Sequence, residues 1–332
     1  MDSKKDRPIN RKNMETNQKI VVMNAGKMNF DGTMDFQTLS ADTIVHADTK
    51  PEEFIEKIKG ARAIVTKELP VPATLIEQFP DSVELIVEAG TGYNNIDIEA
   101  ARKRHITVCN IPAYSSERVA HTAVMMLLAL SSSMQRQIGM LAKNDRSNFT
   151  EHLKVPHTEV NGKTLGVVGA GNIGSEVVKI GLALGMKVLI YKRHKGIDIE
   201  NVKYVSLEQL LKQSDYLSLH CPLTPETHHI IDKNAIALMK PTAFLINTAR
   251  GALINEPALI EALSTGKIAG AGLDVQEQEP PAADNPLYKL DNVILTPHIG
   301  WKGYETRQRL LGIIRDNIQG FFNGKPINVV SA

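Results

Sequence analysis

The segment Gly169-Ala170-Gly171-Asn172-Ile173-Gly174 constrains the fold of this chain more than any other feature of its sequence. It follows the apolar run Lys163–Val168, which predicts a strand, and precedes Ser175–Leu184, which predicts a helix. A G-x-G-x-x-G turn in that setting is typical of a dinucleotide-binding βα unit. The first glycine permits the tight turn, the second lets a pyrophosphate approach the backbone, and the third lets the helix pack closely. The alternative is a tight βα turn without a ligand.

Short apolar runs alternate with helix-length segments along most of the chain. Runs such as Ile20–Met23 and Leu85–Val87 are unbroken, which is typical of strands buried on both faces of a parallel sheet. Amphipathic segments lie between them, for example Pro51–Lys59, which has proline in its first turn and Gly60 after its last. The 332 residues are enough for two domains, so we predict an α/β protein with two doubly wound parallel sheets.

Two polar interruptions of this pattern predict where the domains meet. Asn110–Ser116 precedes a long helical pattern that runs from Glu117 to Leu141. Thr296–Gly300 precedes a final helix from about Tyr304 to Phe322.

We predict from these interruptions that the middle of the chain is an inserted domain. Residues 116–300 would form a Rossmann NAD(P)-binding domain, and residues 19–115 and 301–332 a flavodoxin-like substrate domain. Residues 1–18 would be a mobile N-terminal extension. Two consecutive domains split near Tyr114 would produce almost the same pattern.

The overall charge and the two cysteines exclude several classes of protein. Lys and Arg number 38 against 37 Asp and Glu, a formal net charge of +1, so we expect neither nucleic acid nor a membrane surface as a partner. The longest apolar run, Ala123–Leu130, is far below the ~20 residues that span a bilayer, and the polar start of the chain lacks a signal-peptide pattern. Cys109 and Cys221 form neither a disulfide framework nor a metal-ligand spacing. We expect no metal and a cytoplasmic location.

A run of potential cations, Lys192-Arg193-His194-Lys195, follows the predicted strand Lys187–Tyr191. In an NAD-binding fold this place, ~20 residues beyond the glycines, holds an acid that binds the ribose 2′-hydroxyl. A basic run would instead attract a 2′-phosphate, and Arg193 is able to stack on adenine and bind phosphate oxygens. We therefore predict NADP(H) as the preferred cofactor, with NAD(H) possible. The alternative is a solvated basic loop.

Polar residues follow three later apolar runs, where the carboxyl ends of parallel strands open into a ligand crevice. Arg250 follows the first run, several acids within Ala271–Pro280 follow the second, and His298 follows the third. These residue types suit hydride transfer to a 2-oxo acid, which needs an anchor for the substrate carboxylate and a proton donor near neutral pH. The alternatives are a surface ion pair for the arginine and a structural role for the histidine, and spacing alone does not show that the three converge.

Five motifs in order resemble those of the D-isomer-specific 2-hydroxyacid dehydrogenase family. They are GAGNIG at Gly169–Gly174, the segment Leu210–Thr224, NTARG at Asn247–Gly251, GLDVQEQEP at Gly272–Pro280 and TPHIGW at Thr296–Trp301. The resemblance runs from about Lys19 to the end of the chain. Within the family, Ala89–Asn94, Asn110–Ser115 and the position of Trp301 are most similar to glycerate dehydrogenase, also called hydroxypyruvate reductase.

The resemblance implies catalytic roles for three residues. Arg250 would bind the carboxylate and the carbonyl of the substrate, and His298 would protonate the carbonyl oxygen as hydride arrives from the nicotinamide. Glu279 would hydrogen-bond His298 and keep it charged, with Glu277 as a nearby competitor for that role.

The resemblance also implies binding residues and a homodimer. Backbone N–H groups at Thr91 and Gly92 would hold the substrate carboxylate, so both domains would have to close on the substrate. Asp274 would lie near the nicotinamide amide. The expected cofactor-binding residues are Gly169, Gly171, Asn172, Ile173, Gly174, Lys192, Arg193, His194, Pro222, Thr227, Thr248, Ala249, Arg250, Asp274, His298 and Gly300.

Four positions bear on specificity. Lys192 stands where members that use NAD usually carry Asp, which agrees with the cofactor prediction from charge. Gln276 replaces a commonly aromatic residue and His121 stands where an acid or amide is frequent, and both could reshape the cleft. Lys67 could reach a substrate carboxylate, although a solvated side chain is the favoured interpretation.

We therefore expect an NADPH-dependent oxidoreductase that reduces a small 2-oxo acid, with hydroxypyruvate and glyoxylate as the first candidates. Two alternatives stay open. One is a dehydrogenase for another D-2-hydroxy acid such as D-lactate. The other is a nucleotide-sensing protein like the corepressors that share this fold.

Overall fold

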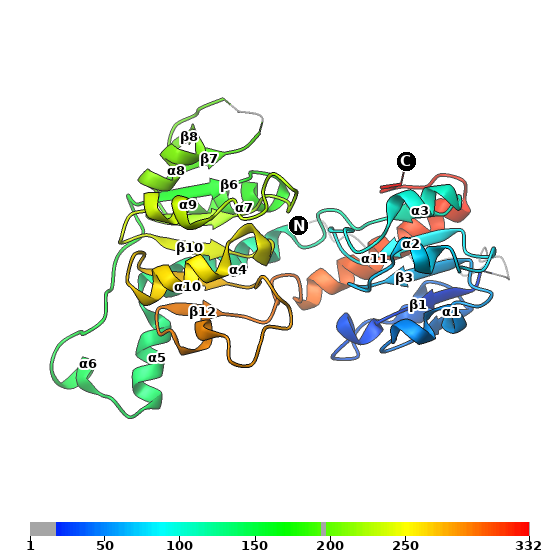
Figure 1. Cartoon of the computed structure of the whole chain (residues 1–332), viewed down its shortest axis with the longest axis horizontal. Helices are drawn as coiled ribbons and strands as arrows, with labels where there is room; N and C mark the ends of the chain where they lie inside the picture. The colour runs from blue at the N-terminus through cyan, green and yellow to red at the C-terminus, as the bar shows by residue number, and fades with distance from the viewer. Residues whose placement is uncertain (1–17, 194–196, 332) are drawn as a thin grey trace, which may run out of the picture. The chain divides into compact units, whose positions relative to one another are not determined.

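A computed structural model of the chain describes residues 18–193 and 197–331, and these form two compact units (Figure 1). Unit 1 contains the chain up to Tyr114 and from Tyr304 onward, and unit 2 contains Ser115–Gly303, so unit 2 is inserted into unit 1 in sequence. The predicted boundaries at 115/116 and 300/301 lie one and three residues from these. The predicted extension 1–18 falls outside the described residues except for Gln18, whose carbonyl accepts a hydrogen bond from Ser40.

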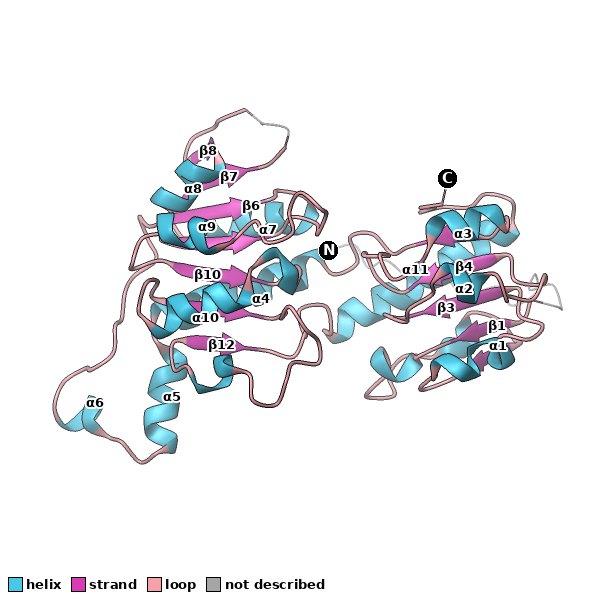
Figure 2. Cartoon of the chain, in the orientation of Figure 1, coloured by secondary structure: helices cyan, strands magenta, loops and turns pink. Residues whose placement is uncertain are grey.

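Unit 1 is built on a five-stranded parallel sheet, whose strand arrows all run one way in Figure 2. The strands follow the order β2-β1-β3-β4-β5, which is that of flavodoxin-like folds. They are β1 (Ile20–Val22), β2 (Thr43–Val45), β3 (Ala63–Thr66), β4 (Leu85–Glu88) and β5 (Thr107–Cys109). The helices are the 3-10 turns η2 (Ala25–Lys27), η3 (Phe36–Thr38) and η4 (Pro51–Glu53), and α1 (Phe54–Lys57), α2 (Ala73–Ile76), α3 (Ile98–Lys103) and α11 (Tyr304–Phe322).

The C-terminal segment of the chain completes unit 1. Helix α11 packs against β4, and its buried Arg307 forms an ion pair with Asp31, with Nη1 2.6 Å from Oδ1. This guanidinium lowers the pKa of the Asp31 carboxyl well below its usual range. After α11 the chain returns to the edge of the sheet, where Val329 pairs with Cys109 of β5.

Unit 2 is built on a seven-stranded parallel sheet of order β12-β11-β10-β9-β6-β7-β8. Read from β8, this is the strand order of dinucleotide-binding folds with one further strand, and the order reverses between β6 and β9. The strands are β6 (Thr164–Val168), β7 (Lys187–Tyr191), β8 (Val202–Tyr204), β9 (Tyr216–Leu219), β10 (Phe244–Asn247), β11 (Gly270–Leu273) and β12 (Val293–Leu295). The helices are α4 (Ser116–Ser131), α5 (Met134–Ala142), α6 (Ser147–Thr150), α7 (Asn172–Ala183), α8 (Leu207–Gln213), α9 (Lys233–Leu238), η5 (Gly251–Leu253), α10 (Glu256–Ser264) and η6 (Pro286–Lys289).

Both faces of this sheet are covered by apolar side chains. Leu245 and Ile246 are neighbours in β10 and point to opposite faces, and they belong to two separate buried clusters. Strands buried on both faces explain the unbroken apolar runs of the sequence. The predicted class, two parallel-sheet α/β domains, is confirmed.

The predicted continuous helix from Glu117 to Leu141 is wrong, because the structure divides it into α4 and α5. Ser133 adopts a left-handed backbone with φ 47°, and its hydroxyl donates to the carbonyl of Pro156 at 2.7 Å. The Ser131 hydroxyl donates to the Leu128 carbonyl at 2.8 Å. Serine hydroxyls compete in this way with the backbone bonds of a helix, and the apolar pattern alone does not reveal it.

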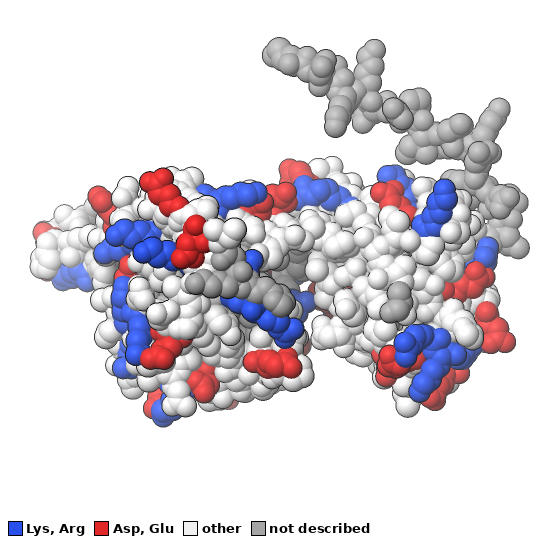
Figure 3. All heavy atoms as spheres, turned by 90° about the horizontal axis from the view of Figure 1, so that it is seen from above, with Lys and Arg blue, Asp and Glu red and all other residues white. Residues whose placement is uncertain are grey.

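The surface carries mixed charge. On the face drawn in Figure 3, Lys and Arg side chains are interspersed with Asp and Glu. Among the described residues, no helix combines the length and the apolar character needed to cross a membrane.

Candidate active site

The glycine turn of unit 2, Gly169–Gly174, is closely packed at its first and last glycines and open at Gly171. Gly169, at φ 88°, directly follows β6, and a Cβ there would lie 2.8 Å from the backbone nitrogen of Cys221. A Cβ at Gly174 would collide with the carbonyl of Gly169. A Cβ at Gly171 would meet no atom within 4 Å. Packing therefore requires the first and third glycines, whereas the second borders free space.

Helix α7 begins beside that free space. Its first residues are Asn172 and Ile173, three positions earlier than predicted, because Gly171 takes the N-cap position. The first turn of a helix has N–H groups without intrahelical partners and a partial positive charge, which suit a pyrophosphate. The turn therefore fits the phosphates of a dinucleotide.

The basic run lies at the carboxyl end of β7. The Lys192 ammonium lies 5.2 Å from the centroid of the Tyr204 ring, and both residues line a cavity of about 230 Å³ at this end of the strand. Arg193 follows at once, and His194 lies outside the described residues. Lys192, the first cation of the predicted run, thus borders a cavity next to the second strand of the dinucleotide fold.

The loops after β9 and β10 hold the next expected cofactor contacts. The Thr227 hydroxyl donates to the carbonyl of Pro222 and accepts from the backbone of Thr224, both at 2.7 Å, so it closes its own loop. The Ala249 N–H donates to the Asn247 side chain at 3.0 Å. The Thr248 hydroxyl is buried and has no hydrogen-bond partner among the described residues. A buried hydroxyl in that state fits a ligand group that would bind there.

Arg250 is half-buried directly after the Asn247–Ala249 turn. Its backbone carbonyl accepts a hydrogen bond from the Asn247 side chain at 2.8 Å, and its Nη1 donates to the carbonyl of Ala249 at 2.7 Å. These bonds fix the backbone and one edge of the guanidinium. The planar fork has further N–H donors, which suit a carboxylate.

His298 and Glu279 form a hydrogen-bonded pair. His298 Nδ1 lies 2.8 Å from Glu279 Oε2, and Glu279 Oε1 accepts the backbone N–H of Gln276 at 3.0 Å. His298 has a left-handed backbone with φ 51°, which is uncommon outside glycine. Both side chains border a cavity of about 380 Å³. The pair engages Nδ1 and leaves Nε2 as the ring atom for proton transfer.

Asp274 lies where the sequence predicts a cofactor contact, but its carboxylate is engaged within the protein. Oδ1 accepts the Thr296 hydroxyl at 2.6 Å and the Ile299 N–H at 2.8 Å, and Oδ2 accepts the Gly300 N–H at 2.8 Å. The His298 N–H donates to the backbone carbonyl of Asp274 at 2.9 Å. Asp274 is buried, and these hydrogen bonds hold the loop that carries His298. Sequence reasoning missed this function.

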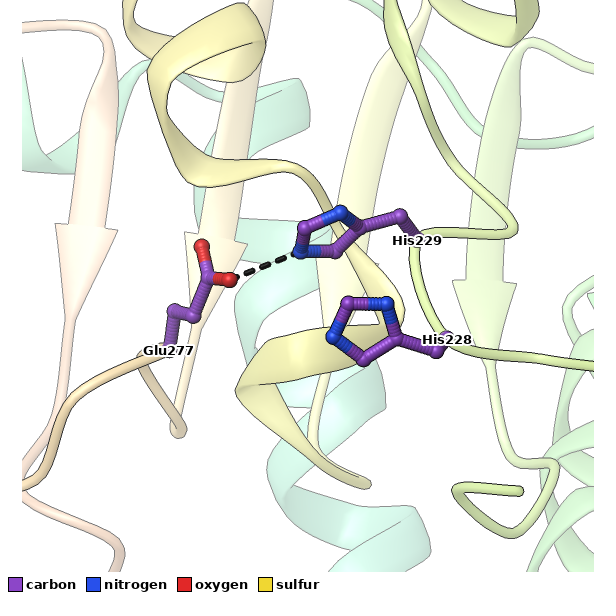
Figure 4. Close-up of side chains that lie close together, drawn as sticks. All are labelled: His228, His229 and Glu277. Carbon is purple, nitrogen blue, oxygen red and sulfur yellow. Dashed lines mark hydrogen bonds and ion pairs between the residues drawn. The ribbon is translucent and has the colours of Figure 1, made fainter. Parts of the chain in front are cut away.

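Glu277, the predicted competitor of Glu279, pairs with a different histidine (Figure 4). His229 Nε2 lies 2.7 Å from Glu277 Oε1, and His228 lies beside the pair with its ring 3.9 Å from that of His229. Asn255 Nδ2 lies 3.4 Å from His229 Nδ1, while Asn255 Oδ1 accepts the Ala258 N–H. The Asn255 amide therefore donates to Nδ1, which places the ring proton on Nε2 and directs it to Glu277. The bond between His229 and Glu277 thus anchors the loop that carries Glu279.

His220 is a further half-buried group that sequence reasoning did not single out. It follows β9 and lies under the glycine turn, and its Nε2 is 2.8 Å from the Ser218 hydroxyl. Burial lowers the pKa of His220 to about 4. The only sequence signal was its position at the end of a strand.

Thr91 and Gly92, the expected substrate contacts, belong to unit 1 and not to the unit that carries Arg250 and His298. They follow β4, where the Thr91 hydroxyl donates to the carbonyl of Ile111 at 2.9 Å and the Asn110 side chain donates to the carbonyl of Thr91 at 2.7 Å. These bonds occupy the hydroxyl and the carbonyl of Thr91.

Lys67 is not solvated, so the interpretation favoured from the sequence is wrong. Its exposed fraction is 3%, and its ammonium forms an ion pair with Glu68 at 2.9 Å. Lys67 directly follows β3, and the register that pairs Thr66 with Glu88 brings it beside the end of β4. The packing of neighbouring strands buries a residue whose local sequence predicts a loop.

Comparison with known proteins identifies the family. Residues 124–300 match the profile described as "D-isomer specific 2-hydroxyacid dehydrogenase, NAD binding domain". A hydroxypyruvate reductase from Blautia hydrogenotrophica is 39% identical, over 94% of this chain and 99% of its own length.

Solved structures agree. D-Lactate dehydrogenase from Aquifex aeolicus, complexed with NAD and lactic acid, has a TM-score of 0.83 and 33% identity over 94% of this chain and 99% of its own. An acyclic imino acid reductase in complex with NADPH and D-Arg has a TM-score of 0.80 and 30% identity over the same shares of the two chains. These comparisons confirm the expected oxidoreductase class and an NAD-binding domain. The chain belongs to the D-isomer-specific 2-hydroxyacid dehydrogenase family.

Proposed function

We propose that this protein is an NADPH-dependent reductase of small 2-oxo acids, with hydroxypyruvate and glyoxylate as substrates and D-glycerate and glycolate as products. The hydrogen bond of 2.8 Å between His298 and Glu279, beside a cavity of about 380 Å³, is the observation that carries the proposal. A histidine oriented through one ring nitrogen is what a proton donor to a carbonyl oxygen needs. The similarity to a hydroxypyruvate reductase supports this choice of substrate.

Each catalytic residue has one proposed task. The Arg250 guanidinium binds the substrate carboxylate and polarises the carbonyl. His298 delivers the proton from Nε2 to the carbonyl oxygen, and Glu279 stabilises the charged ring through Nδ1. The bound nicotinamide supplies the hydride, so each turnover consumes one NADPH and one proton. Asp274 keeps His298 in place in two ways. Its backbone carbonyl accepts the His298 N–H, and its carboxylate accepts the Gly300 N–H.

We assign substrate binding to the domain formed by residues 19–115 and 301–332. The backbone N–H groups at Thr91 and Gly92 would receive the substrate carboxylate. The carboxyl ends of the strands in this sheet are the usual position of ligands in an open parallel sheet.

We assign cofactor binding to the domain of residues 116–300. The proposed contacts are the glycine turn with Asn172 and Ile173, the loop residues Pro222, Thr227, Thr248 and Ala249, and Arg250, Asp274, His298 and Gly300. Lys192, Arg193 and His194 would bind the 2′-phosphate, which makes NADP(H) the preferred cofactor and NAD(H) the weaker one. The similar solved structures include one complex with NADPH and one with NAD, so the choice of cofactor is proposed from the basic run.

A steady-state panel tests the proposed function. Hydroxypyruvate, glyoxylate and pyruvate are each offered with NADPH and with NADH, and loss of the reduced nicotinamide is followed. We expect the highest kcat/KM for hydroxypyruvate or glyoxylate with NADPH. A preference for pyruvate would establish a D-lactate dehydrogenase. Tight nucleotide binding without turnover of any acid would establish the nucleotide-sensing alternative.

We also propose that the protein is a homodimer in the cytoplasm. None of the nine residues of α5 is buried, and its exposed side chains include Met134, Ile138 and Leu141. Figure 1 shows α5 and α6 extending away from the sheet of unit 2, and an exposed apolar patch of this kind marks an interface. Light scattering should report a dimer that Ile138→Glu weakens. A cytoplasmic location suits the two free cysteines.

A further inference from the structure

The carboxyl edge of the sheet in unit 1 carries a cluster of charged groups, two of them buried, next to the proposed substrate loop. Its members are Lys67 and Glu68, directly after β3, and Glu88, the last residue of β4. Lys67 is 3% exposed and Glu88 1% exposed. Buried ionised groups are costly, so their presence at this edge calls for a physical reason.

Neutral donors satisfy most of the Glu88 carboxyl. It accepts the Thr66 hydroxyl at 2.7 Å, the Asn95 amide at 3.0 Å and the Glu68 N–H at 3.0 Å. Burial raises the pKa of Glu88, and these hydrogen bonds and the charge of Lys67 act in the opposite direction. Glu88 therefore fixes the turn after β3 through hydrogen bonds.

The Lys67 ammonium lies against the substrate loop. A Cβ built at Gly90 would lie 3.5 Å from Lys67 Nζ, 3.6 Å from Glu88 Oε1 and 3.7 Å from the carbonyl of Gly92. The positive charge thus sits beside the backbone from Gly90 to Gly92. A buried cation attracts an anion bound on a neighbouring loop more strongly than an exposed cation would, because the protein interior screens charge less than water does.

Glu68 supplies the carboxylate that covers this ammonium in the structure. Its Oε1 lies 2.9 Å from Lys67 Nζ, its Oε2 lies 3.8 Å from Lys27 Nζ, and its side chain is 42% exposed. Its backbone is left-handed, with φ 52°, which turns the side chain back over Lys67. An exposed carboxylate in that position resembles the group that a 2-oxo acid substrate would bring.

We propose that Lys67 is a second anion-binding group of the substrate site and that Glu68 is its internal competitor. The proposal rests on the function proposed above, since it takes the loop of Thr91 and Gly92 as the carboxylate site. The substrate carboxylate would draw on the charge of Lys67 while the Glu68 side chain turns toward solvent. Small, compact acid anions are favoured over neutral carbonyl compounds for this reason.

Two substitutions with opposite expected signs test the proposal. Lys67→Met should raise the KM for the 2-oxo acid by about tenfold and Glu68→Gln should lower it severalfold, with kcat changed less than KM in both. Lys67→Arg should restore most of the affinity. The control is Lys103→Met, which removes the same charge from an exposed position of α3 in the same unit. Circular dichroism and thermal unfolding report whether each variant folds.

Binding of oxalate to the full-length protein with excess NADPH, measured by calorimetry, separates this proposal from the choice of substrate. Oxalate should bind more weakly to Lys67→Met and more tightly to Glu68→Gln, even if no tested 2-oxo acid is turned over. Unchanged oxalate affinity and unchanged KM in folded Lys67→Met overturn the proposal. A Glu68→Gln variant that binds oxalate no more tightly than wild type also overturns it, as does wild-type protein that does not bind oxalate.

Discussion

His298 forms its side-chain hydrogen bond with Glu279, at 2.8 Å, while Glu277, two positions earlier, bonds His229 at 2.7 Å. One short loop thus holds two acids that serve two different histidines. The proposed proton donor, His298, bonds Glu279 directly, whereas Glu277 affects it only through the loop that both acids share.

Glu279→Gln should reduce kcat about 10²-fold in the reductive direction, because a neutral amide stabilises a charged imidazole less well than a carboxylate does. Glu277→Gln is the matched control and should reduce kcat at most a few-fold, since the amide oxygen still accepts the His229 proton. Equal losses in the two variants would contradict the assignment of Glu279.

His298→Gln should reduce kcat by about 10²–10⁴-fold, because it removes the proton donor and leaves the rest of the site in place. NADPH affinity, measured by fluorescence titration, should stay near that of the wild type. Turnover close to the wild-type rate in this variant would show that another group delivers the proton.

Asp274→Ala should destabilise unit 2 by about 2–3 kcal/mol, because it leaves the Thr296 hydroxyl and two backbone N–H groups without their buried acceptor. Activity should fall with it, since the same bonds fix the loop of His298. Thermal unfolding and kcat are both measured, with Asp284→Ala at an exposed position as the control. A stable Asp274→Ala variant with full activity would rule out the anchoring role.

Lys192→Asp combined with Arg193→Ala should shift preference from NADPH toward NADH. The aspartate repels a 2′-phosphate and offers a partner for a 2′-hydroxyl, so the NADPH-to-NADH ratio of kcat/KM should fall at least tenfold. Lys212→Asp, on the exposed side of α8, is the control for the change of charge. An unchanged ratio would mean that the basic run is a solvated loop that does not bind the 2′-phosphate.

His220 should make the stability of the protein depend on pH. Burial lowers the pKa of His220 from 6.5 to about 4, so between these values the unfolded chain takes up a proton that the folded protein does not. The free energy of unfolding should therefore fall as the pH falls from about 6.5 toward about 4, by up to about 3 kcal/mol. His220→Gln should abolish this part of the loss, and His152→Gln at an exposed position should keep it. Denaturant unfolding at several pH values within this window is the measurement.

Strands and helices with one dominant pattern were predictable from the sequence. The apolar run Lys187–Tyr191 is β7 residue for residue, and the last helix, Tyr304–Phe322, is α11. Strands of a parallel sheet are buried on both faces, so local composition is enough to find them. The break at Ser133 was not predictable, because it depends on a hydrogen bond to Pro156.

The partners and the burial of the other site residues depend on contacts between distant segments, which the sequence does not reveal. The partners of the Asp274 carboxylate lie 22 to 26 positions further along the chain, and no spacing rule indicates which donors will reach it. Lys67 is buried by the neighbouring strand β4, although its own segment reads as a polar turn. The motifs supplied the residue types of the site, and tertiary packing supplied their partners.

Unit 1 is assembled from two pieces of chain that lie on either side of unit 2 in the sequence. Arg307 pairs with Asp31, 276 positions earlier, and the Val108 N–H donates to the Ser331 hydroxyl, 223 positions later. During synthesis all of unit 2 is translated before the helix that completes unit 1, and domains generally fold as units while the chain emerges. Unit 2 is therefore the part of the newborn chain able to fold first, although synthesis begins with unit 1.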